Sequence, residues 1–126
     1  MKHILAIIRI SKMNETKLAL EEAGLPSFTV LGVMGRGRGR GMGPNYQEIL
    51  DNPANKEILS QLGHESRLKS KRMIMLIVPE EKKDLAVETI IRINQTGNSG
   101  DGKIFVVDTI DSIRIRSGER GDLTLD

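Results

Sequence analysis

The chain has no cysteine and no tryptophan, and only three of its 126 residues are aromatic. The lack of cysteine excludes a disulfide framework, a thiolate metal site and a thiol nucleophile. No apolar run approaches the ~20 residues of a membrane span, and the run at 4–8 is too short for a signal peptide. We therefore expect a cytoplasmic protein with an aliphatic core and no membrane insertion.

Charge is distributed unevenly along the chain, although the formal net charge is only +2. Residues 35–72 contain eight basic and four acidic side chains, a net of +4, and the other 11 basic and 13 acidic residues give −2. A segment with its own charge usually has its own partner. The length fits one domain, and 38% hydrophobic and 29% charged residues fit a globular one.

The apolar pattern predicts two β-α-β units separated by a long irregular segment. Asn14 is a candidate helix cap and Gly24 a candidate helix stop, and a second helix is predicted from Pro79 to near Gly97. The predicted strands are residues 3–10, 28–34, 73–78 and 104–110, with a short fifth strand at 113–116.

Two such units predict one α+β domain over residues 1–126, a ferredoxin-like βαββαβ sandwich with a short extra C-terminal strand. Two helices would cover one face of an antiparallel sheet. Because the strands are apolar on both faces, we expect self-association to bury the second face, in a trimer or another closed ring.

The segment 35–72 is predicted to be a long mobile loop, because it opens with a Gly-Arg repeat that holds neither helix nor strand. Short helices are possible at 46–50 and 53–63, and we expect the loop to become ordered on a partner. The repeat is similar to arginine-glycine tracts that bind RNA, although the chain has no aromatic platform for bases. The alternative is a flexible, solvated loop stem.

Residues that could carry catalysis are hard to find. The two histidines have no ligand spacing and the serines lack a nucleophile-elbow context, so we expect neither an enzyme nor a metal site. A phosphate site is better supported. Three glycines at 97–102 can turn backbone N–H groups toward an anion, and Lys103 adds a charge. A plain glycine-rich turn with a solvated lysine is the alternative.

Two arginines near the C-terminus bear on the same question. Arg114 and Arg116 are two residues apart on the predicted fifth strand, so both would leave one face of it. Paired guanidiniums suit phosphate. The alternative is a solvated strand edge, and both interpretations stay open at this point.

Residues 96–106, Thr-Gly-Asn-Ser-Gly-Asp-Gly-Lys-Ile-Phe-Val, resemble the nucleotide loop of the PII nitrogen-regulatory proteins. Residues 113–119 resemble the C-terminal signature of that family, and the resemblance extends over roughly 1–38 and 71–120. It implies a trimeric or hexameric assembly of ferredoxin-like subunits. It also implies ATP or ADP, with Mg, in clefts between neighbours.

The resemblance also implies functional residues. Nucleotide-binding positions would be Thr29, Gly35, Gly37, Arg38, Gly97, Gly100, Asp101, Gly102, Lys103, Arg114 and Arg116. The effector 2-oxoglutarate would meet Lys71, Gly37, Arg38, Gly39 and Gly41, where Gly39 replaces a glutamine that many members carry. The partner-binding loop would use Arg36, Arg40, Tyr46, Arg67 and Lys69. Tyr46 lies too far before Lys71 to match the tyrosine that some members uridylylate.

The long loop is similar to that of PII-like proteins encoded among nitrogen-fixation genes, in particular the second, longer-loop paralogue. The resemblance implies a non-enzymatic sensor that docks its loop on the dinitrogenase (MoFe-type) component and inhibits nitrogenase. The chain would assemble with itself or with a PII-like paralogue. Alternatives are a general PII regulator of an ammonium transporter or glutamine synthetase and, more remotely, an RNA-binding protein.

Overall fold

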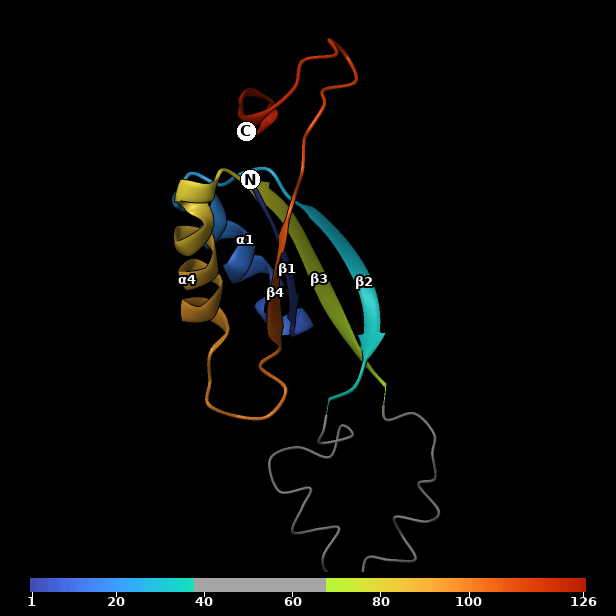
Figure 1. The fold of residues 1–126 in the computed structure, drawn as a ribbon. Coiled ribbons are helices and arrows are strands. Elements are labelled where there is room, and N and C mark those ends of the chain that lie inside the picture. The colour runs from blue at the N-terminus through green and yellow to red at the C-terminus, as the bar shows by residue number, and fades with distance from the viewer. Residues whose placement is uncertain (38–67) are drawn as a thin grey trace, which may run out of the picture.

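A computed structural model describes residues 1–37 and 68–126 of the protein. Its elements in chain order are β1 (Lys2–Ile8), the 3-10 turn η1 (Ile10–Lys12), α1 (Met13–Glu22), β2 (Thr29–Gly35), β3 (Lys69–Val78), η3 (Glu80–Lys82), α4 (Lys83–Asn94), β4 (Lys103–Asp108) and η4 (Asp122–Thr124). The strands form one antiparallel sheet in the order β2-β3-β1-β4. Both helices cover the same face of it (Figure 1). The predicted ferredoxin-like α+β sandwich is confirmed.

Several sequence predictions fall on residues 38–67, which lie outside the described part of the chain. They concern the helices at 46–50 and 53–63 and the residues Arg38, Gly39, Arg40, Gly41, Tyr46 and Arg67.

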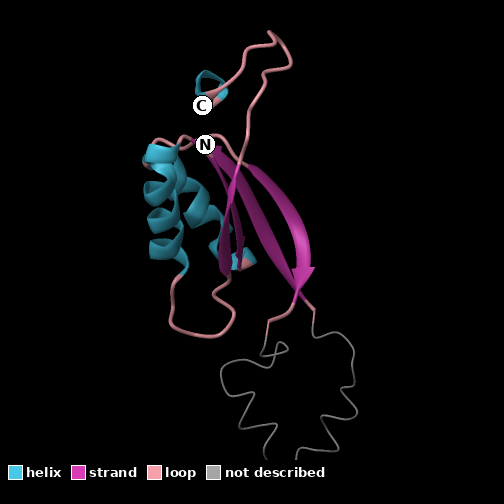
Figure 2. Cartoon of the chain, in the orientation of Figure 1, coloured by secondary structure: helices cyan, strands magenta, loops and turns pink. Residues whose placement is uncertain are grey.

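The core lies between the sheet and the helices, as the cartoon in Figure 2 shows. Alternate residues of β1 and β3 point into it, and Ile4 and Ile74 are fully buried. The helices contribute Leu20 and Ile90, whose exposed fractions are 0% and 1%. Burial of one such aliphatic side chain contributes about 1.5–3 kcal/mol to folding. Among the described residues the core is aliphatic, as predicted.

The helix boundaries differ from the prediction at three of their four ends. Asn14 lies inside α1 and caps nothing, because the turn η1 precedes the helix and Lys12 is its N-cap. The same arrangement recurs before α4, which begins at Lys83, after η3. That helix ends at Asn94, since the next residue has an extended backbone. Gly24 does end the first helix, with a φ of 82° and its N–H donating to the carbonyl of Glu21.

The strand boundaries also need correction. β1 ends at Ile8 and β4 at Asp108, two residues earlier than predicted in each case. β3 begins at Lys69 rather than Met73, because residues 69–72 pair with the last residues of β2. Backbone hydrogen bonds thus extend the sheet into a polar sequence that carries no apolar pattern.

The predicted fifth strand at 113–116 is wrong for the described chain, which forms only an isolated bridge between Ile113 and Arg120. The N–H groups of Ser117 and Gly118 both donate to the carbonyl of Arg114, at 3.3 and 2.7 Å. Gly118 has a φ of 75°, which suits a tight turn. The segment therefore folds back on itself, and a four-residue alternation was too short to separate strand from turn.

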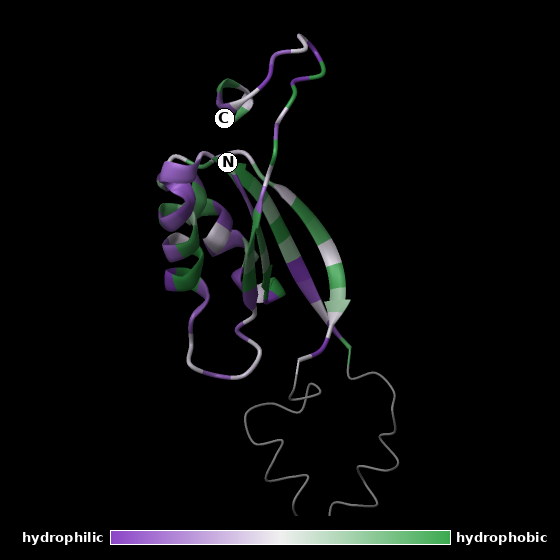
Figure 3. Ribbon diagram, viewed as in Figure 1, coloured by the Kyte–Doolittle hydropathy of each residue, from purple (hydrophilic) through white to green (hydrophobic). Residues whose placement is uncertain are grey.

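The helix-free face of the sheet remains apolar and accessible. Hydrophobic residues run along all four strands in Figure 3. The register aligns Leu31 with Met73 and Phe105 with Leu5 on this face. Leu31 is 46% and Phe105 is 48% exposed.

No helix in the described ranges is both long and apolar enough to cross a bilayer.

Candidate functional site

A pocket of ≈ 310 Å³ lies where β2 ends, β3 begins and the loop after α4 enters β4. Segments far apart in sequence meet here, and six residues of the predicted nucleotide and effector sites line it together. Its lining residues are Ile7, Gly35, Arg36, Gly37, Lys71, Gly100, Gly102, Lys103 and Phe105. Ile7, Arg36 and Phe105 are the three that the predicted nucleotide and effector sites did not include. The pocket combines apolar strand residues with several cations.

The backbone of the loop depends on two glycines. Gly100 and Gly102 have φ values of 98° and 106°, a region that side chains rarely allow. A Cβ atom on Gly102 would overlap the carbonyl oxygen of Ile7. The close approach of this loop to β1 therefore requires glycine, which agrees with the prediction that these residues shape a special loop.

Asp101 holds the loop together from inside. Its carboxylate accepts hydrogen bonds from the N–H groups of Thr96 and Gly97, at 2.7 and 2.9 Å, and from the Thr96 hydroxyl. It also pairs with Arg9, whose Nη1 lies 2.6 Å from Oδ1. Burial favours the neutral acid, but the hydrogen bonds from Thr96, Arg9 and Gly97 outweigh it and hold the pKa of Asp101 well below its ordinary 3.8. Asp101 was predicted to bind the nucleotide, and its contacts show that it shapes the loop.

Arg9 is the residue that sequence reasoning missed. It follows β1, and its Nη2 donates to the carbonyl of Ser99 at 3.0 Å while Nη1 pairs with Asp101. One side chain thus fastens the loop to the end of β1. In the sequence Arg9 only closes an apolar run. Its partner Asp101 is 92 positions away, and no local pattern indicates the contact.

Lys71 enters the pocket from β3. Its Nζ donates to the carbonyl of Gly100 at 2.9 Å. Burial, together with repulsion from Arg9 and Lys69, lowers the pKa of Lys71, while Asp101 acts in the opposite direction. Cations crowded together in this way gain stability from a bound anion. The pocket is therefore suited chemically to phosphate or carboxylate groups.

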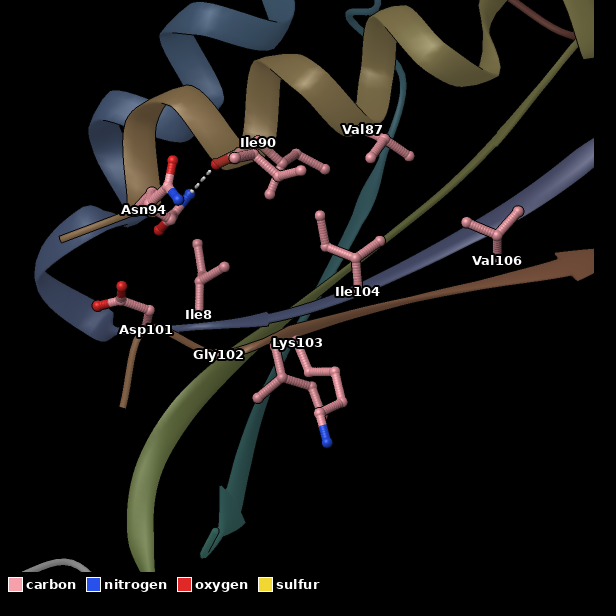
Figure 4. Close-up of a pocket in the computed structure, with 12 residues that line it drawn as sticks. Ile8, Val87, Ile90, Asn94, Asp101, Gly102, Lys103, Ile104 and Val106 are labelled. Carbon is pink, nitrogen blue, oxygen red and sulfur yellow. Dashed lines mark hydrogen bonds between the residues drawn. The ribbon is translucent and has the colours of Figure 1, made fainter. Parts of the chain in front are cut away.

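A second hollow, of ≈ 500 Å³, lies behind the same loop between α4 and β4. Figure 4 shows Val87 and Ile90 of the helix facing Ile104, while the Lys103 side chain points away from the helix. The lining is mostly aliphatic, so the hollow has no place for a phosphate. Among its lining residues, one buried polar atom has no hydrogen-bond partner, the amide oxygen of Asn94.

Three further predicted nucleotide-binding residues, Thr29, Arg114 and Arg116, lie at the opposite end of the sheet. Thr29 begins β2 and Gly35 ends it, which separates them by roughly 20 Å at ~3.3 Å per residue. Thr29 lines another pocket, of ≈ 600 Å³, with residues that include His3, Phe28 and Asp126. The C-terminal segment extends from this end too (Figure 1). The residues predicted to form one nucleotide site thus fall into two groups, which lie at opposite ends of the sheet within one chain.

Arg114 and Arg116 belong to the second group, but they do not share a strand face as predicted. Arg116 is exposed in the turn at 115–117. Arg114 is engaged within the chain, with Nη1 2.8 Å from Oε1 of Glu119 and Nη2 3.3 Å from the carbonyl oxygen of Leu123. In this conformation the Glu119 carboxylate lies beside the Arg114 guanidinium, where an anionic ligand would have to bind.

Comparison with known proteins decides the family. The family described as "Nitrogen regulatory protein P-II" matches residues 1–119. The chain belongs to the P-II family. A P-II protein is a regulatory signal transducer and not an enzyme. In the described ranges, no three His, Cys, Asp or Glu side chains are grouped so as to hold a metal ion.

Relatives of this P-II protein extend over nearly its whole length. "Nitrogen fixation nifHD region glnB-like protein 2" of Methanococcus maripaludis is 44% identical over 99% of this chain and 100% of its own. A protein of the same description from Methanobacterium ivanovii is 43% identical over 97% of each chain. "Nitrogen regulatory protein P-II 1" of Escherichia coli is 38% identical over 99% of this chain and all of its own. The resemblance drawn from the sequence, including its nitrogen-fixation subgroup, is confirmed.

Proposed function

We propose that this P-II protein binds ATP or ADP between neighbouring subunits, responds to 2-oxoglutarate and inhibits nitrogenase by docking residues 35–72 on the dinitrogenase component. The observation that carries the proposal is the cationic pocket in which Lys71 and Lys103 meet the glycine loop. Backbone groups of a left-handed glycine turn and two lysines match a polyphosphate. Mg²⁺ would accompany the nucleotide, with phosphate oxygens among its ligands.

The separation of the two groups of predicted residues supports the proposal that the nucleotide binds between subunits. Thr29 and Arg114 lie at the far end of the sheet from Gly37 and Lys103, so one chain cannot bring both groups to one nucleotide. A second copy can bring its far end to this pocket. The accessible apolar sheet face supports such self-association, and a closed ring would bury it. We therefore propose a trimer, or a hexamer built from it, in which Thr29 and Arg114 of one subunit complete the pocket of the next.

The same pocket supports the proposal for 2-oxoglutarate. The effector is a dicarboxylate, and Lys71 is a cation already placed within hydrogen-bond distance of the loop at Gly100. Gly37 lines the pocket as well, whereas three further predicted effector residues lie outside the described chain. A carboxylate beside Lys71 would relieve the repulsion from Arg9 and Lys69. Binding of the effector and of the nucleotide would thus be coupled through one loop.

The proposed target rests on the relatives and on charge. Several relatives are described by their place in a nitrogen-fixation region, and segment 35–72 carries a net charge of +4. We propose that this segment, including Arg36 and Lys69, docks on the MoFe-type dinitrogenase, with a P-II paralogue as a further subunit. Charge steers such encounters, so inhibition should weaken as salt is raised.

Two measurements test this function. Calorimetric titration with Mg-ATP, with and without 2-oxoglutarate, should show binding, and the effector should change its affinity. The chain mixed with its paralogue should lower nitrogenase turnover when 2-oxoglutarate is scarce. Absence of nucleotide binding would remove the basis of the proposal, and unchanged turnover would remove the nitrogenase part of it.

A second candidate function is regulation of an ammonium transporter or of glutamine synthetase. It is favoured by the 38% identity to the general regulator of Escherichia coli over the full length of both chains. Pull-down of each candidate target by the purified chain separates the two functions. RNA binding by the Gly-Arg tract stays a prediction, since most of that tract lies outside the described residues.

A further inference from the structure

Within the described residues, Arg114 forms an ion pair with one acid only, Glu119. Its Oε1 lies 2.8 Å from Nη1 of Arg114 and also accepts a hydrogen bond of 2.6 Å from the Ser117 hydroxyl. The backbone holds the two residues together as well, since the Arg114 N–H donates to the Glu119 carbonyl at 2.9 Å. The carboxylate is therefore placed beside the guanidinium by the turn itself, and not by chance contact of two long side chains.

The pair is partly accessible, with the Arg114 side chain 28% and the Glu119 side chain 46% exposed. The hydrogen bonds from Ser117 and Arg114 lower the pKa of Glu119, so it carries its negative charge at neutral pH. A guanidinium can approach a phosphate in bidentate fashion only with its planar edge free. Here the carboxylate occupies part of that edge.

We propose that Glu119 is an internal competitor for the anion-binding guanidinium of Arg114, and that a bound polyphosphate must displace it. The inference rests on the proposed function, in which Arg114 reaches the phosphates of a nucleotide held by the neighbouring subunit. The closed pair reduces the fraction of subunits ready to bind. The apparent dissociation constant rises by the inverse of that fraction. Glu119 thus sets the nucleotide concentration at which the sensor responds.

The same segment offers a matched control. Asp111 pairs with Arg120 at 3.2 Å on the same C-terminal turn, and its other carboxylate oxygen accepts hydrogen bonds from the N–H groups of Ser112 and Gly121. Asp111→Asn removes one negative charge from the same turn, keeps an acceptor oxygen at this position, and changes neither side chain of the Arg114–Glu119 pair. An effect of net charge alone would therefore appear in both variants, whereas competition for Arg114 would appear only at Glu119.

The experiment compares Mg-ATP and inorganic tripolyphosphate binding by calorimetry, using the assembled full-length protein. Glu119→Gln and Glu119→Ala should both tighten binding about two- to fivefold, the range expected for release of an exposed ion pair. The factor should be the same for both ligands, because the gain arises at the phosphates and not at the base. Asp111→Asn should leave the affinity unchanged.

A double-mutant cycle completes the test. Arg114→Ala should weaken binding, and Arg114→Ala/Glu119→Gln should bind no better than Arg114→Ala alone. A gain that persists without Arg114, or that Asp111→Asn shares, would overturn the competition. Weaker binding by Glu119→Ala would do so too and would make Glu119 a residue that positions Arg114. If the wild-type protein binds nucleotide while Glu119→Gln gains nothing, this inference fails and the proposed function survives. No binding by the wild-type protein defeats both.

Discussion

The glycine loop at 95–103 and the C-terminal turn at 111–121 each combine glycines with an acid that pairs with an arginine, yet they use this acid differently. In the loop, Asp101 binds backbone N–H groups and Arg9, which leaves Lys71 and Lys103 to line the pocket. In the turn, Glu119 binds Arg114, the predicted ligand-binding cation itself. Asp101 therefore shapes the backbone beside the proposed anion site, whereas Glu119 occupies a guanidinium that is proposed to bind the anion.

The largest effect should come from breaking the loop at its closest approach to β1. Gly102→Ala puts a Cβ against the Ile7 carbonyl oxygen at a φ of 106°, and we expect a loss of about 2–4 kcal/mol of stability. Gly97→Ala is the matched control, because its φ is 87° but a Cβ there meets nothing within 4 Å. It should cost about 1–2 kcal/mol. Chemical denaturation measures both, and equal losses would contradict the argument from contact.

The next effect concerns the acid of the loop. Asp101→Asn leaves one acceptor oxygen where two served Thr96, Gly97 and Arg9, so unfolding should become easier by about 1–3 kcal/mol. Anion affinity should fall with it, because the loop loses its shape. The control is Asp108→Asn at the other end of β4, where the carboxylate pairs with Lys2 in an exposed position. That variant should unfold at nearly the same denaturant concentration as the wild type.

The pH dependence of the same variant sharpens the point. Folding lowers the pKa of Asp101 below its unfolded value of 3.8, so its contribution to stability is complete above that value. The contribution is lost as the pH falls through the folded pKa. The stability difference between wild type and Asp101→Asn should therefore shrink as the pH is lowered from 5 toward 2. A difference that stays constant over this range would show that the charge of Asp101 carries none of the effect.

The smallest effect on stability is expected at Lys71. Lys71→Met keeps the aliphatic stem and removes a charge that is crowded by Arg9 and Lys69, so stability should change by less than about 0.5 kcal/mol. Affinity for 2-oxoglutarate, measured by calorimetry, should nevertheless fall about tenfold, since a charge-assisted hydrogen bond is lost. Lys69→Met, the neighbour outside the pocket, should bind normally. Loss of folding in Lys71→Met would assign it a structural role instead.

The sequence was sufficient for the fold and for one half of the candidate site. Nearly continuous apolar runs in β1 and in the second half of β3 indicated buried strands, and the spacing of Gly100, Gly102 and Lys103 indicated a special loop. Chain topology then brings Lys71 and Gly37 to that loop. These features depend on local patterns, or on the resemblance to a family whose members share the same order of elements.

What the sequence could not predict depends on distant contacts. Arg9 reaches Asp101 across 92 positions, and no local pattern encodes that pair. The alternation of Ile113 to Arg116 suits a strand. In the structure, however, the backbone N–H groups that follow it form the hydrogen bonds of a turn that ends at Gly118. The division of the predicted site between two ends of the sheet also depends on the antiparallel strand order, which no local pattern encodes.

The strand order leaves β2 and β4 as the two outer strands, beside an apolar sheet face. Among residues 1–37 and 68–126, each outer strand has one edge without a strand partner, and such edges are templates for indiscriminate strand pairing. If the proposed assembly forms, a single chain outside it would therefore be the most aggregation-prone form of this protein. In the proposed assembly with a paralogue, an excess of this chain over its partner would then remain in that aggregation-prone form.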